Sequence, residues 1–178
     1  MRFLASLVLA AALVVGAMGA ELKLTGDNTK IEFTGKKPDG KHDGGFKKLT
    51  GTVTADAADL TKTKIEVTID MDSLYSDNEM LTAHLKNPDF FDVKTVPNSK
   101  FVSTKVEKDG DGYKVTGKLT MNNKEKEISF PAKITTDGGV FKLESEFKIK
   151  RLDFDVGTKF PEARIDNDVA MKLKIEVK

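Results

Sequence analysis

The sequence predicts an all-β protein: a single antiparallel β-barrel of about eight strands, with a short helix that covers one opening. Three features lead to this prediction. Apolar and polar residues alternate through most of the chain, the segments between the alternating runs are short, and the alternation breaks off between Ser76 and Phe101. A period of two is typical of an antiparallel sheet that is packed on one face and solvated on the other.

Each predicted strand places apolar side chains at every second position. In Val140–Lys150, for example, Phe141, Leu143 and Phe147 alternate with lysine and glutamate. Three of the eight runs, the first, second and fourth, are weaker than the others. The eight runs are Ile31–Phe33, Leu49–Val53, Lys64–Asp72, Phe101–Val106, Tyr113–Met121, Glu127–Ile134, Val140–Lys150 and Val169–Val177.

The connections between these runs are typical of hairpin turns. Glu107–Tyr113 reads EKDGDGY, Asn122–Lys124 reads NNK and Thr136–Gly139 reads TDGG. Gly, Asn and Asp tolerate the positive φ angles that tight hairpins require. Eight strands joined mainly in this way can close into a barrel and remove their edges.

The apolar faces are expected to point into the barrel. A transmembrane barrel would place them outward and would need aromatic girdles at both rims. This chain has no Trp and two Tyr, and its polar faces carry many Lys and Glu. About eight strands enclose an interior that side chains can fill or that can hold one small ligand. Alternation alone leaves a packed core and a ligand cavity both open.

The break in the alternation predicts the helix. Ser76–Glu79 reads SDNE, which fits a capping box in which Ser76 accepts from the N–H of Glu79. The apolar spacing that follows predicts a short helix to about Lys86, and Pro88 then favours a turn. We expect this helix to lie across one end or side of the barrel. The side chains expected to face the interior are Leu81, Leu85, Phe90 and Phe91.

Phe90 and Phe91 are expected to act differently although they are adjacent. Successive side chains in an extended or turn segment point to opposite sides. One ring should therefore anchor the helix and the other should border a ligand. We assign the anchor to Phe91, because it leads into the following strand.

The first twenty residues, 1–20, are predicted to be a secretory signal peptide. They carry one charge, at Arg2, followed by an apolar run and small residues at the end. Two glycines and the short length argue against a membrane anchor. We expect residues 21–178 to form one domain and to be located in the periplasm or secreted.

Charge and cysteine content exclude several classes of function. The full chain has 29 basic and 28 acidic side chains, and removing Arg2 with the signal peptide leaves 28 of each. A neutral balance argues against nucleic acid as a partner and against strong attraction to anionic membranes. The chain has no Cys, so no disulfide and no thiol chemistry are expected.

Five segments, in this order and spacing, resemble those of the YceI-like family. The most characteristic segment lies at His84–Phe101, where HLKNPDFFDV precedes VPNSKF. The others are IEF…HDGGFKKLTGTV at Ile31–Val53, VTIDMDSL at Val67–Leu74, VTGKLTMNNKEKEISFP at Val115–Pro131 and IKRLDFDV at Ile149–Val156. The resemblance implies an exported bacterial protein with a lipocalin-like barrel that binds polyisoprenoid lipids.

The chain also departs from the family pattern at a few positions. Leu81, Thr82 and Ala83 stand where the family often has Arg-Asp before the His-Leu pair, and Val96 stands where an aromatic residue is common. Asp155 replaces a frequent glycine, and Asn122–Asn123 replaces a turn that contains glycine. These departures bear on which lipid is bound and on the contacts to its head group, and less on the fold.

The resemblance therefore implies non-catalytic binding or carriage of an isoprenoid or quinone-type lipid, with no other cofactor and no metal. The apolar partner would lie inside the barrel, without stable membrane insertion, and a homodimer is left open. The candidate ligand-binding residues are Phe33, Phe46, Val67, Ile69, Leu81, Leu85, Phe90, Phe91, Phe101, Leu119, Phe130 and Phe147.

Two other functions compete with lipid binding. An extracytoplasmic enzyme acting on a small apolar substrate would need catalytic groups, but the two histidines lie in unpromising places. His42 is expected in a solvated loop, and His84 on the apolar side of the helix with its ring bonded to the backbone. A surface interaction module with a packed barrel would need an exposed apolar patch, for which the loop Gly157–Arg164 is the candidate.

Overall fold

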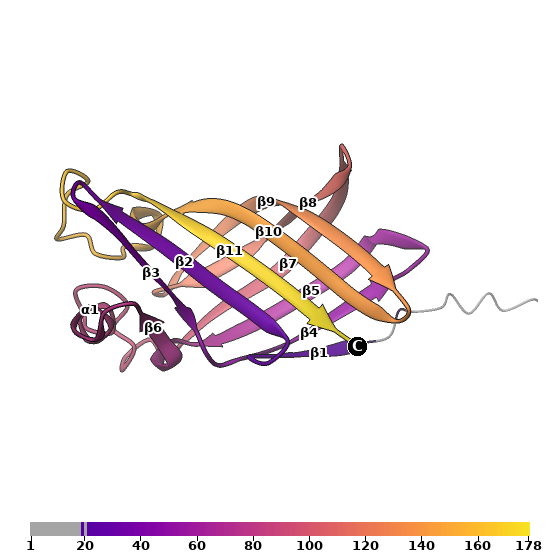
Figure 1. The fold of residues 1–178 in the computed structure, drawn as a ribbon, viewed down its shortest axis with the longest axis horizontal. Helices are drawn as coiled ribbons and strands as arrows, with labels where there is room; N and C mark the ends of the chain where they lie inside the picture. Colours follow the sequence, from indigo (N-terminus) through magenta and orange to yellow (C-terminus); the bar gives the residue numbers. More distant parts are fainter. Residues whose placement is uncertain (1–18, 20) are drawn as a thin grey trace, which may run out of the picture.

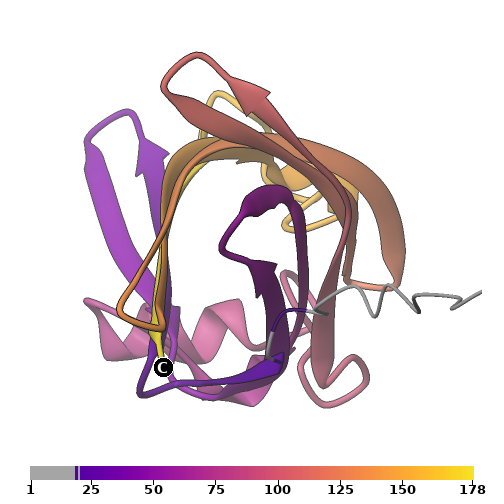
Figure 2. The ribbon, with the colours of Figure 1, turned by 90° about the vertical axis from the view of Figure 1, so that its right-hand side faces the viewer.

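The computed structural model describes Gly19 and residues 21–178, and in them one antiparallel sheet curls around an apolar interior (Figures 1 and 2). The order of strands in the sheet is β1-β4-β5-β7-β8-β9-β10-β11-β2-β3-β6. The strands are β1 (Glu21–Thr25), β2 (Thr29–Lys37), β3 (Gly40–Phe46), β4 (Leu49–Asp56), β5 (Asp59–Asp70), β6 (Leu74–Ser76), β7 (Asn98–Asp109), β8 (Gly112–Met121), β9 (Lys124–Asp137), β10 (Val140–Lys150) and β11 (Asp168–Val177).

The predicted fold class is confirmed. Eight of the strands contain the eight alternating runs, and their charged positions lie on the outer face. The described residues form an eleven-stranded sheet rather than one of about eight strands, because β1, β3 and β6 join it. The edge strands of the sheet are β1 and β6, and the chain joins their neighbours β3 and β4 through Lys47 and Lys48.

The remaining elements lie mainly at one end of the barrel, which we call the α1 end. They are the helix α1 (Glu79–Leu85) and the 3-10 helices η1 (Met71–Ser73) and η2 (Arg151–Phe154). In Figure 1, α1 and the segment after η2 lie at the end opposite to the C-terminus. No helix in the described part of the chain is long and apolar enough to cross a membrane.

Helix α1 ends where the sequence predicts, but its cap differs. Asn78, not Ser76, is the N-cap residue, and its Oδ1 accepts from the N–H of Leu81 at 2.9 Å. The capping box at Ser76 is therefore wrong. Ser76 is held in strand β6, which pairs with β3, so the chain is still extended there and the helix starts after it.

Hairpin turns carry the positive φ angles that their residues suggest. Asn122 and Asn123, in the turn between β8 and β9, have φ values of 50° and 60°, and Asp155, which ends η2, has a φ of 54°. These are the positions at which the chain replaces glycine of the family pattern. Asn and Asp tolerate this conformation better than other residues that have a side chain. These three residues therefore adopt a left-handed backbone without a glycine.

The interior is closely packed at the end opposite to α1, which we call the packed end. Leu24, Val53, Val115 and Phe141 lie there, and each is at most 1% exposed. They belong to one cluster of buried residues to which most of the strands contribute. These four side chains fill the packed end, so the site is to be sought between them and α1.

The predicted signal peptide, residues 1–20, lies outside the described residues apart from Gly19.

Candidate functional site

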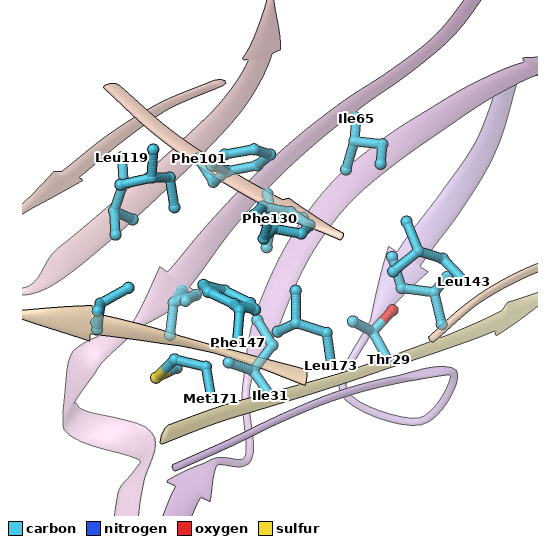
Figure 3. A pocket seen from close by; sticks show the side chains of 15 residues that line it. Thr29, Ile31, Ile65, Phe101, Leu119, Phe130, Leu143, Phe147, Met171 and Leu173 are labelled. Atoms are coloured by element: carbon cyan, nitrogen blue, oxygen red, sulfur yellow. The ribbon is translucent and has the colours of Figure 1, made fainter. Parts of the chain in front are cut away.

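The barrel interior contains a central cavity lined by fifteen side chains (Figure 3). Its volume is about 90 Å³. A single water needs about 10–15 Å³ of such space, so the cavity exceeds a packing defect. The lining residues are Thr29, Ile31, Ile65, Val67, Ile69, Phe101, Leu119, Ile128, Phe130, Leu143, Phe147, Ile149, Met171, Leu173 and Ile175.

The burial of these side chains shows that the interior is not filled. Seven of the fifteen are only half-buried although they point inward. They are Phe101, Leu119, Ile128, Phe147, Ile149, Met171 and Leu173. A close-packed core would bury such large apolar side chains almost completely. The incomplete burial of these side chains around the cavity indicates that they do not form a solid core in this region.

Three aromatic rings form one wall of the central cavity. Phe130 and Phe147 stack with ring centroids 4.5 Å apart, and Phe101 lies 5.7 Å from Phe130 at a tilt. Phe101 lies against Gly117, where an added Cβ would be 2.5 Å from the Phe101 ring. A side chain at Gly117 would also meet the backbone oxygen of Val102 at 2.5 Å. The glycine therefore lets the ring lie flat against the sheet.

The central cavity has one polar side chain in its lining, Thr29. Its hydroxyl donates to Asn28 Oδ1 at 3.0 Å, and the residue is 2% exposed. Figure 3 shows Thr29 beside Leu143, at the opposite end of the cavity from Met171. The surface that the cavity presents to a ligand is therefore apolar along its whole length, because the Thr29 hydroxyl is buried and bonded to Asn28.

A second apolar space, the outer cavity, lies at the α1 end and has a volume of about 120 Å³. Leu85, Phe90 and Phe91 cover it from helix α1 and the turn that follows, while the other lining residues come from the strands and from η2 with its following segment. Those residues are Phe33, Gly35, Phe46, Met121, Ile149, Arg151, Val156, Ile165, Val169 and Met171. Helix α1 thus covers one opening, as predicted.

Arg151 is a buried cation that organises the segment covering the outer cavity. It is 4% exposed, and all five of its N–H groups donate to backbone carbonyls. Burial lowers the pKa of the guanidinium, and the nearby Glu162 and Asp166 act in the opposite direction. The acceptors are Asp166 (3.1 Å, from Nε), Val156 (3.0 Å), Gly157 (2.7 Å), Phe160 (2.7 Å) and Ile165 (2.9 Å).

The segment that Arg151 holds meets the turn after α1 through an aromatic cluster. Phe90 and Phe160 stack with centroids 5.1 Å apart, and the ring of His84 stands edge-on to both. Lys159 forms an ion pair with Asp89, and its hydrogen bond is the main cause of the lowered pKa of that carboxyl group. Two segments far apart in sequence thus close the α1 end together.

Both histidines lie outside the cavity linings and differ from expectation. His42 lies in strand β3 rather than in a loop, because its segment pairs with β2, and its Nδ1 is 2.9 Å from Asp77 Oδ1. His84 lies against Phe90 and Phe160, and its Nε2 is 3.8 Å from Asp89. Its expected bond to the backbone is replaced by these contacts.

The structure divides eleven of the predicted ligand-binding residues between the two cavities. Val67, Ile69, Phe101, Leu119, Phe130 and Phe147 line the central cavity. Phe33, Phe46, Leu85, Phe90 and Phe91 line the outer cavity. Leu81 is half-buried and lines neither cavity, so the prediction that it faces the interior is not met.

Several lining residues were not among those predicted. Most lie on the alternating apolar faces, so the pattern that located the strands could also have located them. Arg151 continues the inward series Phe147–Ile149 by one more step of two, which could have marked it as an inward charge. No pattern in the sequence marked Thr29 as a lining residue.

The comparisons with known proteins agree with this arrangement. The model of the YceI-like domain matches residues 22–177. The chain belongs to the YceI-like family. Its curated relatives include a UPF0312 protein of Serratia proteamaculans (strain 568), 34% identical over 139 residues, which are 75% of this chain and 71% of the relative. Protein YceI of Escherichia coli O157:H7 is 32% identical over 137 residues, 74% of this chain and 72% of that protein.

Solved structures of similar proteins have the same fold. BcnA of Burkholderia cenocepacia is 28% identical, with a TM-score of 0.81 over 86% of this chain and 98% of BcnA. A domain of Saccharophagus degradans described as polyisoprenoid binding is 13% identical, with a TM-score of 0.69 over 89% of this chain and 98% of that domain. The fold is thus the same in proteins whose sequence identity to this chain is too low for individual side chains to be compared.

The two neighbouring phenylalanines of the YceI-like segment are buried to different extents. Phe90 is 6% exposed and stacks on Phe160, whereas Phe91 is half-buried and contacts both clusters of apolar residues. Phe91 packs against the main barrel cluster, but both rings line the outer cavity, so the division of roles between anchor and ligand contact stays a prediction.

Phe90→Ala is expected to destabilise the protein more than Phe91→Ala. Removing a packed phenylalanine costs about 3–5 kcal/mol, because transfer and cavity terms add. Phe91→Ala should cost clearly less, since its ring is already partly exposed. Urea unfolding of the two single variants measures the difference. Equal losses of unfolding free energy would mean that the two rings act as one packed unit.

Proposed function

We propose that the protein binds an isoprenoid or quinone-type lipid inside the barrel and carries out no catalysis. The observation that carries this proposal is the set of large apolar side chains that point inward and remain half-buried around the central cavity. Membership of a family that has a structural relative described as polyisoprenoid binding supports the same class of ligand.

The energetics favour an apolar chain as the ligand. Burying apolar carbon gains about 0.8 kcal/mol per CH₂. Ten buried methylene equivalents would supply about 8 kcal/mol before the costs of ordering the ligand and the protein. An apolar cavity of this kind also binds water poorly, so a lipid that enters it displaces few favourable contacts with water.

The chemistry of the lining supports binding rather than an enzymatic reaction. In the described part of the chain, the polar side chains that line the two cavities are Thr29 and Arg151. The donors of Arg151 are already bonded to carbonyls, and a guanidinium does not act as a base at neutral pH. Neither residue has a partner that would activate it as a nucleophile or a general base.

A calorimetric titration of the delipidated protein with geranylgeraniol tests this proposal. We expect saturable binding of one alcohol per chain and a negative heat-capacity change, the mark of apolar burial. The alcohol should be recovered unchanged. Conversion of the alcohol into a product would favour the enzyme instead. Absence of binding would favour a surface interaction module.

We further propose that the chain is exported to the periplasm, because residues 1–20 have the charge, the apolar run and the small residues of a signal peptide. The exported protein is expected to begin near Ala20 or Glu21. N-terminal sequencing of the periplasmic fraction checks this. An intact Met1 in the membrane fraction would contradict it.

A further inference from the structure

The central and outer cavities share two lining residues, Ile149 and Met171. Both are inward-facing and half-buried, and they lie on the neighbouring strands β10 and β11. The register places Met171 opposite Phe147 on one side and opposite Phe33 on the other. Phe147 lines the central cavity and Phe33 lines the outer one. Met171 therefore stands at the boundary between the two spaces.

The two boundary side chains differ in mobility. Ile149 is β-branched, so its χ1 angle is restricted on a strand. Met171 is unbranched, has three rotatable side-chain bonds and can adapt its shape to a neighbouring group. A lipid chain that passes from one cavity into the other can thus displace Met171 with little strain, whereas Ile149 stays as a fixed wall.

We propose that Met171 is a specificity-determining residue that sets the length of lipid chain the barrel accepts. The inference rests on the proposed lipid binding. A chain that fits between Thr29 and Met171 leaves the boundary in place, and a longer chain must move Met171 to continue into the outer cavity. Ile175 lies four positions after Met171 on β11, so the inner compartment is about 13 Å long at about 3.3 Å per residue.

The boundary at Met171 matters because the opposite end of the barrel is packed. Leu24, Val53, Val115 and Phe141 are each at most 1% exposed, so this end is closely packed. We therefore expect a chain that outgrows the central cavity to extend toward the α1 end, past Met171. The outer cavity, at about 120 Å³ beside about 90 Å³, more than doubles the space once the boundary is open.

The test compares wild type, Met171→Ala and Met171→Phe with three alcohols, geraniol, farnesol and geranylgeraniol, which have two, three and four isoprene units. The measured quantity is the ratio of the affinity for geranylgeraniol to that for geraniol. We expect Met171→Ala to raise this ratio at least tenfold, because the two cavities become continuous. Met171→Phe should lower it at least tenfold, because a ring closes the passage.

Leu173→Ala is the matched control. Leu173 lies two positions along the same strand, faces inward and lines only the central cavity. Its truncation should weaken all three alcohols by similar factors and leave the ratio within about threefold of wild type. If Met171→Phe does not fold, Met171→Ala alone decides the result.

The outcomes separate this inference from the proposed function. If wild type binds the alcohols and the ratio stays within twofold in Met171→Ala, the role of Met171 is wrong while lipid binding stands. If Leu173→Ala changes the ratio as much as Met171→Ala, the change results from the larger cavity volume alone. The boundary role of Met171 is then also wrong. If wild type binds none of the alcohols, the proposed function itself fails.

Discussion

The double variant Leu119→Phe/Leu173→Phe is expected to lose lipid affinity at least a hundredfold without losing stability. Both leucines are half-buried, face inward and line the central cavity. Two added rings would occupy space that about four methylene groups of a lipid would use. At about 0.8 kcal/mol per CH₂ this amounts to about 3 kcal/mol, or roughly a hundredfold in the dissociation constant.

The free energy of unfolding of this double variant is expected to rise while its lipid affinity falls. Filling a true cavity with apolar atoms commonly adds about 0.5–2 kcal/mol to the free energy of unfolding. Overfilling a packed core instead costs about 1–3 kcal/mol. Urea unfolding beside the lipid titration measures both effects. A variant that is destabilised and still binds lipid would show that the ligand lies elsewhere.

The control is Lys118→Phe/Lys172→Phe, which places the same two rings one position away, on the outer face of strands β8 and β11. Both lysines are exposed, and their ion pairs with Glu125 and Glu146 lie at the surface. Such pairs contribute little to stability. Lipid affinity should therefore stay within about threefold of wild type, since the interior is unchanged.

Arg151→Met is expected to lower the free energy of unfolding by about 3–5 kcal/mol, less than the full cost of five unpaired buried acceptors. The substitution removes the donors for five backbone carbonyls in residues 156–166. A buried acceptor left without a partner costs about 1–3 kcal/mol, and water can replace only part of the loss. Lipid release should also become faster, because Val156 and Ile165 of this segment cover the outer cavity.

Two further variants test whether the effect is specific to the guanidinium of Arg151. Arg151→Lys keeps the charge, but an ammonium has three donors and lacks the planar fork of a guanidinium, so it should recover only part of the stability. Arg164→Met removes an exposed arginine from the same segment and should change stability by less than about 0.5 kcal/mol. Hydrogen exchange of the amides in residues 155–167 provides the local measurement. Unchanged protection in Arg151→Met would contradict the proposed role.

Much of this fold could be predicted from the sequence, because the alternation of apolar and charged residues directly reflects a sheet with one dry face. Strand β1 was not predicted although Leu22 and Leu24 alternate with polar residues in it, whereas β3 and β6 escaped prediction for a physical reason. The segment of β3 contains three glycines and a single large apolar residue, Phe46, and β6 has only three residues. Both are extended because neighbouring strands supply their hydrogen-bond partners, and such tertiary pairing leaves no periodic signal.

The site was less predictable than the fold. Alternation identifies which side chains point inward, but it does not tell whether they fill the space they enclose. That depends on how the Phe101, Phe130 and Phe147 rings lie against the sheet, and on Gly117, which lets one ring lie flat. The cap of the α1 end depends on contacts between Phe90 and Phe160, seventy residues apart in the chain, which no local pattern reports.

The most direct test of lipid binding is to purify the protein without detergent from the bacterial periplasm, extract it with organic solvent and analyse the extract by mass spectrometry. The Leu119→Phe/Leu173→Phe variant, purified in parallel, gives the background. We expect an isoprenoid or quinone-type lipid close to one molecule per chain from wild type and at least tenfold less from the variant. An extract of wild type with no such lipid above the level of the variant would contradict lipid binding in the barrel.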